Sequence, residues 1–201
     1  MIKKIPHEEI PRFSLGEVLN QPRHPVKVMV HNIRSLYNVG SVFRTADSAG
    51  IAEVILCGYT GAPPRKEIEK TALGSTQSVR WRYHASIFDA IAEEKAAGYR
   101  IGALEIARPS LSFNDLEREH FPMVLVLGNE ITGVDDDVLA SCDFALEIPQ
   151  FGYKQSLNVA VAFGVGVYGV VDRYRTLFPG ERPPIPFQPP VDAGDTSSDA
   201  D

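Results

Sequence analysis

Short apolar runs of strand length alternate with segments of helical period along most of this chain. The runs that we expect to be strands span residues 26–31, 53–57, 79–83, 100–105, 123–127 and 144–148. The helices expected between and around them span residues 14–19, 38–49, 65–72, 86–97, 115–118, 135–140 and 156–177. Strands that alternate with helices predict an α/β fold, with a mostly parallel sheet covered by helices on both faces.

The length of 201 residues suits one domain with a sizeable core. Four prolines among residues 1–25 predict an extended N-terminal arm. We place the folded domain at residues 26–178 and a Pro-rich, acidic tail at residues 179–201. A tail of that composition buries no core, so we expect it to be disordered.

Membrane, secretory and metal-binding classes find no support in the composition. No basic segment precedes an apolar core at the N-terminus, and the apolar run at 157–171 is shorter than the roughly 20 residues that span a bilayer. Cys57 and Cys142 are not spaced as metal ligands, and the five histidines form no HxxxH or HxH pair. We therefore expect a soluble, cytoplasmic protein with no metal and with both cysteines as small buried residues.

Charge is distributed unevenly, although the net charge is −6. Residues 23–82 hold nine Lys and Arg against four Asp and Glu, a local excess of five positive charges. Such a segment is compatible with a polyanionic partner, and equally with ordinary surface scatter. Candidate RNA contacts are Arg65 and Lys66, which follow two prolines, and Arg80 and Arg82, which flank the aromatic Trp81. The alternative is a solvated strand edge with Trp81 in the core.

Three polar, glycine-bearing segments each follow or end a predicted strand. They span residues 32–45, 125–133 and 148–160. Open α/β sheets bind ligands at the carboxyl ends of their strands. We therefore expect the three segments to meet in one pocket.

These segments closely resemble the three motifs of the SpoU (TrmH-type) RNA ribose 2′-O-methyltransferases of the SPOUT superfamily. The matching stretches are NVGSVFRTAD at 38–47, LGNE at 127–130 followed by Gly133, and IPQFG at 148–152 followed by SLNVA at 156–160. The sequence departs from the family pattern at Gln150, where methionine is common, and at Ala160, where serine is common. Larger relatives also carry an N-terminal RNA-recognition domain, whereas this chain has a short arm.

The resemblance implies a SPOUT-type α/β knot, whose C-terminal segment forms a trefoil knot around an S-adenosylmethionine (SAM) site. It also implies an RNA substrate, tRNA or rRNA, and a homodimer with the active site near the subunit interface. By the same resemblance, the cofactor-binding residues are Leu127, Gly128, Ile148, Gln150, Ser156 and Leu157. The implied catalytic residues are Arg44, Asn38, Glu130, Ser156 and Asn158.

Arg44 is the strongest catalytic candidate. Arginine binds phosphate with a planar fork, and its guanidinium remains protonated in proteins. Binding a phosphate and stabilising a developing alkoxide are therefore easier roles for it than that of a general base, which the family assigns. The alternative is a surface arginine paired with Asp47 one turn further along the helix.

The other polar candidates each have a structural alternative. Asn38 is expected to cap its helix, and to hold Arg44 or the ribose. Glu130 is expected to fix the arginine or a loop of the partner subunit, and is otherwise a solvated loop charge. Ser156 is the expected N-cap of the last helix, with Asn158 inside the first turn, where both would position the ribose or cofactor. For Gly128 the alternative is a plain turn, and for Ile148 and Leu157 it is core packing.

Two other function classes stay open. A non-catalytic RNA-binding protein would keep the fold, but it has no need for the full set of polar residues. A nucleotide-binding enzyme of the NAD type is disfavoured, because residues 38–43 hold one glycine where a Gly-x-Gly-x-x-Gly fingerprint needs three.

Overall fold

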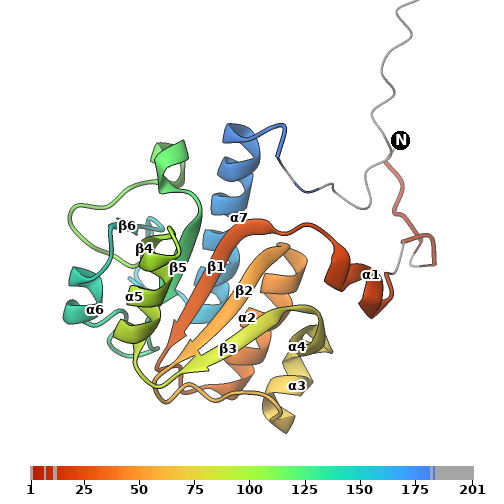
Figure 1. The fold of residues 1–201 in the computed structure, drawn as a ribbon, viewed down its shortest axis with the longest axis horizontal. Helices are drawn as coiled ribbons and strands as arrows, with labels where there is room; N and C mark the ends of the chain where they lie inside the picture. Colours follow the sequence, from red (N-terminus) through yellow and green to blue (C-terminus); the bar gives the residue numbers. More distant parts are fainter. Residues whose placement is uncertain (1, 7, 11–12, 182, 184–201) are drawn as a thin grey trace, which may run out of the picture.

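The computed structural model describes residues 2–6, 8–10, 13–181 and 183. Its centre is a six-stranded sheet of order β3-β2-β1-β5-β4-β6, in which every neighbouring pair is parallel (Figure 1). The strands are β1 (His24–His31), β2 (Ile51–Cys57), β3 (Arg80–His84), β4 (Arg100–Leu104), β5 (Met123–Leu127) and β6 (Phe144–Leu146). The predicted mostly parallel sheet is confirmed.

Helices cover both faces of this sheet, as the sequence predicts. They are α1 (Leu15–Asn20), α2 (Leu36–Ser48), α3 (Lys66–Ala72), α4 (Ser75–Ser78), α5 (Ile87–Ala96), α6 (Asp136–Ala140) and α7 (Val159–Leu177), with 3-10 turns η1 (Phe113–Asp115) and η2 (Arg118–His120). Alternate residues of β1 point to opposite faces of the sheet and belong to two hydrophobic cores. Val28 packs in the core that includes α2 and α7, whereas Met29 packs in the core that includes α5 and α6.

Several strands and helices begin or end at other residues than the sequence predicts. The first strand begins at His24, two residues early, and β4 and β6 end before residues 105 and 147. The segment 115–118 forms parts of two 3-10 turns in place of a helix. The unpredicted α4 exists because Leu73 and Gly74 adopt left-handed φ angles of 52° and 92°, which separate it from α3.

The sheet order places a topological switch point between β1 and β5. From β1 the chain adds β2 and then β3 on one side, while β5, β4 and β6 lie on the other. The connections that follow β1 and β5 therefore lead the chain toward opposite sides of the sheet. A crevice at that position is where open α/β sheets bind ligands.

One cluster of charges under α5 corrects an expectation about RNA contacts. Arg82 forms ion pairs with Glu53 and Glu94, and Lys27 also pairs with Glu94, which is 1% exposed. Arg82 is therefore occupied inside the protein and is wrong as a free RNA contact. Trp81 packs against the core with its ring edge-on to Phe43, as the structural alternative predicts.

The chain ends bear on two further expectations. The short helix expected in the arm is confirmed as α1, which Ser14 and Glu17 cap reciprocally. Most of the predicted tail lies outside the described residues. Among the described helices, none combines the length and apolar character needed to cross a membrane.

Candidate active site

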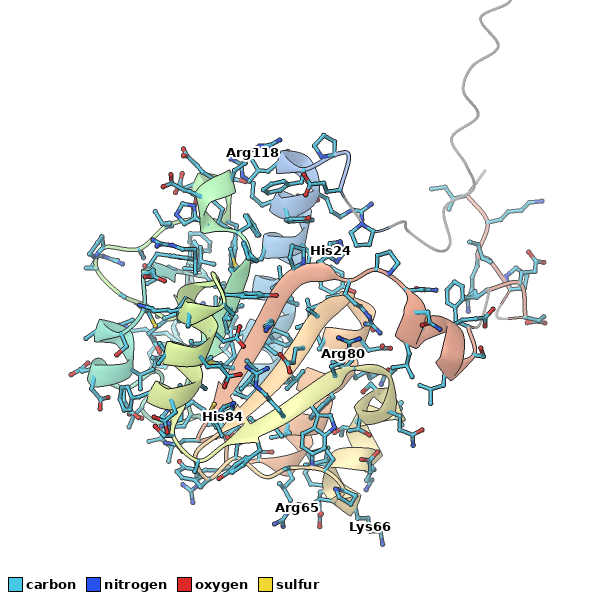
Figure 2. The ribbon with its side chains drawn as sticks, viewed as in Figure 1. His24, Arg65, Lys66, Arg80, His84 and Arg118 are labelled. Atoms are coloured by element: carbon cyan, nitrogen blue, oxygen red, sulfur yellow. The ribbon has the colours of Figure 1, made fainter. Side chains whose placement is uncertain are left out.

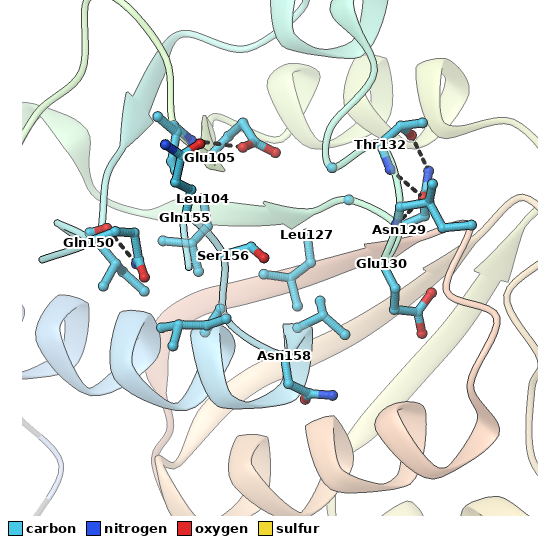
Figure 3. A pocket seen from close by; sticks show the side chains of 18 of the residues that line it. Leu104, Glu105, Leu127, Asn129, Glu130, Thr132, Gln150, Gln155, Ser156 and Asn158 are labelled. Atoms are coloured by element: carbon cyan, nitrogen blue, oxygen red, sulfur yellow. Dashed lines mark hydrogen bonds between the residues drawn. The ribbon is translucent and has the colours of Figure 1, made fainter. Parts of the chain in front are cut away.

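A cavity of about 720 Å³ opens at the carboxyl ends of β4 and β5 (Figure 3). Its walls come from the loop after β5, the segment that precedes α7, and the end of β4. All six predicted cofactor residues line it: Leu127, Gly128, Ile148, Gln150, Ser156 and Leu157. Three of the five predicted catalytic residues line it too: Glu130, Ser156 and Asn158.

The loop after β5 closes on itself and requires a glycine at its base. Asn129 and Gly133 exchange backbone hydrogen bonds of 3.0 and 3.1 Å. The Asn129 carboxamide oxygen also accepts from the Thr132 backbone N–H at 2.9 Å. A Cβ on Gly128 would lie 1.9 Å from the Gly133 carbonyl carbon. Gly128 is thus fixed by the loop's own closure, and the loop forms one wall of the cavity.

Glu130 holds the start of α2. Its two carboxylate oxygens accept hydrogen bonds from the Arg34 and Ser35 backbone N–H groups, both at 3.1 Å, and from the Asn38 side chain at 3.0 Å. Partial burial of the Glu130 carboxyl acts to raise its pKa. The hydrogen bonds, led by that from the Arg34 backbone, outweigh this effect and hold the pKa of the Glu130 carboxyl below its ordinary value. Glu130 is therefore neither a solvated loop charge nor a partner of Arg44 within this chain.

Asn38 joins all three predicted segments. Its side-chain nitrogen donates to Glu130, and its side-chain oxygen accepts from the Asn158 side chain at 3.2 Å, across 120 residues of sequence. Ser35, and not Asn38, caps α2, because its hydroxyl accepts from the Asn38 backbone N–H. The expected capping role of Asn38 is therefore wrong. Its side chain instead connects the other two segments through hydrogen bonds to Glu130 and Asn158.

The last helix begins three residues later than predicted. Asn158 is its N-cap, since its side-chain oxygen accepts from the Ala160 and Val161 backbone N–H groups. Ser156 lies outside the helix, and its hydroxyl makes no hydrogen bond with any described residue. The expected N-cap role of Ser156 is therefore wrong, and Asn158, expected inside the first turn, is the N-cap.

Arg44 does not join this cluster within the single chain. It is exposed on α2, does not line the cavity, and makes no hydrogen bond or ion pair with any residue of the described part of the chain. The alternative pairing with Asp47 is also wrong, because Asp47 pairs with Arg23 and accepts from the Ser78 hydroxyl.

Glu105 is a cavity residue that sequence reasoning missed. Its carboxylate accepts from the Val134 backbone N–H at 2.9 Å, and so fixes the far end of the loop after β5. The predicted strand ran through residue 105, which hid the position. The observed strand ends at Leu104, so a strand end one residue earlier would have exposed Glu105 as a polar residue at the carboxyl edge.

Metal ligation has no candidate in the part of the chain that the structure describes. No group of three or more His, Cys, Asp or Glu side chains lies close enough together to hold an ion. Cys57 is fully buried, as expected, and Cys142 is partly buried. Burial raises the pKa of the Cys57 thiol to about 12.

Most of this chain matches a known protein family. The family model described as "SpoU rRNA Methylase family" matches residues 25–168. The chain belongs to the SpoU rRNA methylase family. Among its relatives in this family is the tRNA (guanosine(18)-2′-O)-methyltransferase of Thermus thermophilus, 30% identical over 78% of this chain and 79% of the relative.

Solved structures of SpoU-type proteins share the fold. The A. aeolicus TrmH/SpoU tRNA modifying enzyme superposes with a TM-score of 0.72 at 28% identity, covering 85% of this chain and 86% of that one. An AdoMet-bound rRNA methyltransferase from Sinorhizobium meliloti gives a TM-score of 0.69 at 29% identity. That match covers 81% of this chain and 61% of the longer neighbour.

Proposed function

We propose that this chain transfers the methyl group of SAM to a ribose 2′-hydroxyl in tRNA or rRNA. The observation that carries the proposal is the hydrogen-bonded chain Glu130–Asn38–Asn158 at the rim of the cavity. It ties together three segments that are far apart in sequence and that match the family's three motifs. Relatives that are named or shown as tRNA and rRNA methyltransferases support the same reaction.

The cavity suits SAM in size and lining. Its volume of about 720 Å³ lies within the usual range for small-molecule sites. Leu127, Ile148 and Leu157 offer apolar surface to an adenine ring. The backbone N–H groups of residues 150–157 donate to no acceptor in the described part of the chain, which leaves them available to the polar groups of a ligand.

SAM, when bound, supplies a methyl carbon activated by its sulfonium. The chain's own residues then have to orient the ribose oxygen toward that carbon, and such alignment can lower the barrier to transfer by several kcal/mol. Ser156, with its uncommitted hydroxyl on the cavity wall, is placed to contact the ribose or cofactor. Glu130, Asn38 and Asn158 act as positioning residues, because their polar groups are already bonded to one another.

We assign Arg44 to the RNA phosphate and to the developing alkoxide, and not to proton abstraction. Because Arg44 lies outside the cavity of its own chain, a second copy of the chain is the natural way to bring it to the reaction. The helix α2 that carries it packs beside α7, on one face of the sheet (Figure 1).

A homodimer through α7 fits the exposed surface of that helix. Val161, Val165 and Tyr168 form a stripe at helical spacing and are 53%, 48% and 51% exposed. An apolar stripe of this kind typically marks a protein–protein contact. A partner packed there would also lie close to α2 and so to Arg44.

We also propose that the segment between β6 and α7 is threaded as a C-terminal trefoil knot. Residues 147–158 leave the edge strand β6, line the cavity beside β5, and enter α7, which packs on α2. The similarity in fold to SpoU-type structures supports this threading.

The proposal is tested by mapping 2′-O-methylation across total RNA from cells with and without the gene. We expect one mark to be lost and to return with the intact chain, but not with Arg44→Ala. An unchanged set of marks would reject methylation of cellular tRNA or rRNA.

Calorimetry separates the alternatives. Binding of SAM with no binding of NAD is the expected result. Binding of NAD alone would indicate a dehydrogenase-like protein, and RNA binding without SAM binding would indicate the non-catalytic RNA-binding protein.

A further inference from the structure

The rim of the cavity continues as a shelf formed by two loops, residues 32–35 after β1 and residues 58–65 after β2. Hydrogen bonds join the loops: the Tyr59 backbone N–H donates to the Asn32 side chain at 3.1 Å, and the Ile33 backbone N–H donates to the Thr60 hydroxyl at 3.1 Å. Thr60 is 3% exposed and also donates to the Val30 carbonyl in β1. The shelf is therefore attached firmly to the sheet.

This shelf begins at the cavity and ends at α3. Glu130, which lines the cavity, accepts from the Arg34 backbone N–H. At the other end, a Cβ added to Gly61 would lie 2.3 Å from a Leu36 methyl and 3.7 Å from the Arg65 side chain, so Gly61 is in close contact with both residues. The two loops of the shelf thus form one connected surface from the cavity rim to the first turn of α3.

Three cations lie on this shelf and the first residue of α3: Arg34, Arg65 and Lys66. The carboxylates next to them are Glu67 and Glu69 in the first turn of α3 and Glu130, which is bonded to the backbone of residues 34 and 35. All three are exposed and form no ion pair or side-chain hydrogen bond within the described residues. Figure 2 shows Arg65 and Lys66 together at the foot of α3, away from Arg80 near the start of β3.

The position of two of these cations does not serve the stability of α3. Arg65 is the N-cap of α3 but makes no side-chain cap hydrogen bond, and Lys66 is its first residue. Glu67 and Glu69, in the first turn of α3, complement the partial positive charge at its start.

An aromatic side chain stands on the same shelf. Tyr59 is 61% exposed, and Tyr83, at the end of β3, donates its hydroxyl to the Gly58 carbonyl. Exposed aromatic rings beside unpaired cations are typical of surfaces that bind unpaired nucleotides, where the rings stack on bases and the cations contact phosphates.

We propose that this shelf binds the RNA strand next to the target nucleotide, with Arg34, Arg65 and Lys66 on its phosphates and Tyr59 against a base. The inference rests on the proposed function, since it assigns the path by which the RNA substrate reaches the cavity. It also separates the basic residues singled out in the sequence: Arg65 and Lys66 contact RNA, whereas Arg80, at the amino edge of the sheet, does not.

The test compares two double variants that lose the same charge. R65Q/K66Q removes two shelf cations, and R80Q/R100Q removes two exposed cations from the first residues of β3 and β4, at the opposite edge of the sheet. Methyl transfer is measured on RNA isolated from cells that lack the gene, over a range of salt concentrations. Filter retention of the same RNA and calorimetry with SAM complete the set.

For R65Q/K66Q we expect the KM for RNA to rise roughly tenfold, with kcat and SAM affinity unchanged. The slope of log affinity against log salt should fall by about 1.4, which corresponds to two lost phosphate contacts on a single strand. R80Q/R100Q should change the KM less than twofold.

Equal effects of the two variants, or an unchanged KM in R65Q/K66Q, would overturn the shelf while the proposed function stands. A wild-type chain that transfers no methyl to this RNA would reject the proposed function. In that case filter retention still decides, because equal retention of RNA by wild-type and R65Q/K66Q would overturn the shelf as well.

Discussion

Glu130 connects the loop after β5 to the first turn of α2 through three hydrogen bonds. Replacing it with glutamine keeps the shape but turns one acceptor into a donor, which faces backbone N–H groups. We expect Glu130→Gln to lower kcat/KM for methyl transfer by roughly 10- to 100-fold, because the start of α2 shifts from its position at the cavity. Glu119→Gln, at an exposed residue of η2, is the control and should leave kcat/KM unchanged.

The same residue predicts a pH dependence of stability. The folded-state pKa of Glu130 lies below its ordinary value, so its contribution is complete above about pH 4.3 and is lost as the pH falls through the folded-state pKa. At neutral pH we expect wild-type to exceed Glu130→Gln in unfolding free energy by no more than about 1 kcal/mol, because the group is exposed. Urea unfolding at pH 7 and pH 3 measures this difference. A difference that grows at pH 3 would contradict the assignment.

Residue-level roles were the part of the site that the sequence predicted least well. The position of the segments at the ends of predicted strands led us to expect that they meet in one pocket, and Glu130 and Asn158 both line the cavity. The motif spacing did not reveal which polar side chain caps each helix. Ser35 and Asn38 are both suitable caps, as are Ser156 and Asn158, and tertiary contacts decide between them.

At the scale of elements, the loop between β5 and α6 depends on close backbone contact. A methyl group on Gly128 would overlap the Gly133 carbonyl carbon and lie 2.2 Å from the Val134 nitrogen. Backbone cannot yield as a flexible side chain does, so the loop must open and the cavity wall must move. We expect Gly128→Ala to weaken SAM binding by at least roughly tenfold in calorimetry.

Gly16→Ala is the matched control for that variant. Gly16 lies in α1, away from the cavity, and a Cβ placed on it meets no atom within 4 Å. Its SAM affinity should stay within about twofold of wild-type. Equal losses in the two variants would contradict the closure of the loop as the cause.

The sequence predicted the presence of the strands and helices better than the residues at which they begin and end. Central strands such as β2 and β5 were identified as apolar runs, because a strand buried on both faces leaves a nearly continuous apolar signal. The edge strand β3 was identified from its alternating pattern. The end of α3 at residue 72 was predicted, but the four-residue helix α4 was missed, because it begins after Leu73, whose left-handed conformation its residue type disfavours. The strand order, which places β5 beside β1, follows from packing across the whole sheet and not from any local pattern.

At the scale of the whole molecule, the exposed stripe on α7 predicts a dimer. We expect Val165→Asp to produce a monomer in sedimentation analysis, because a carboxylate at the centre of an apolar contact loses its hydration. Methyl transfer should fall with it, since Arg44 then has no neighbouring cavity. Gln77→Asp, an equal charge change at an exposed residue of α4, should stay dimeric and active. A wild-type chain that is monomeric and fully active would contradict the dimer.

A crystal structure of the chain with S-adenosylhomocysteine, the product that SAM leaves after methyl transfer, tests the convergence of the three segments most directly. We expect the adenosine between the loop after β5 and the segment before α7, against Leu127, Ile148 and Leu157. The sulfur should point toward the rim where Asn38, Glu130 and Asn158 are joined. Binding at any other place on the molecule, with this cavity filled only by water, would contradict the account.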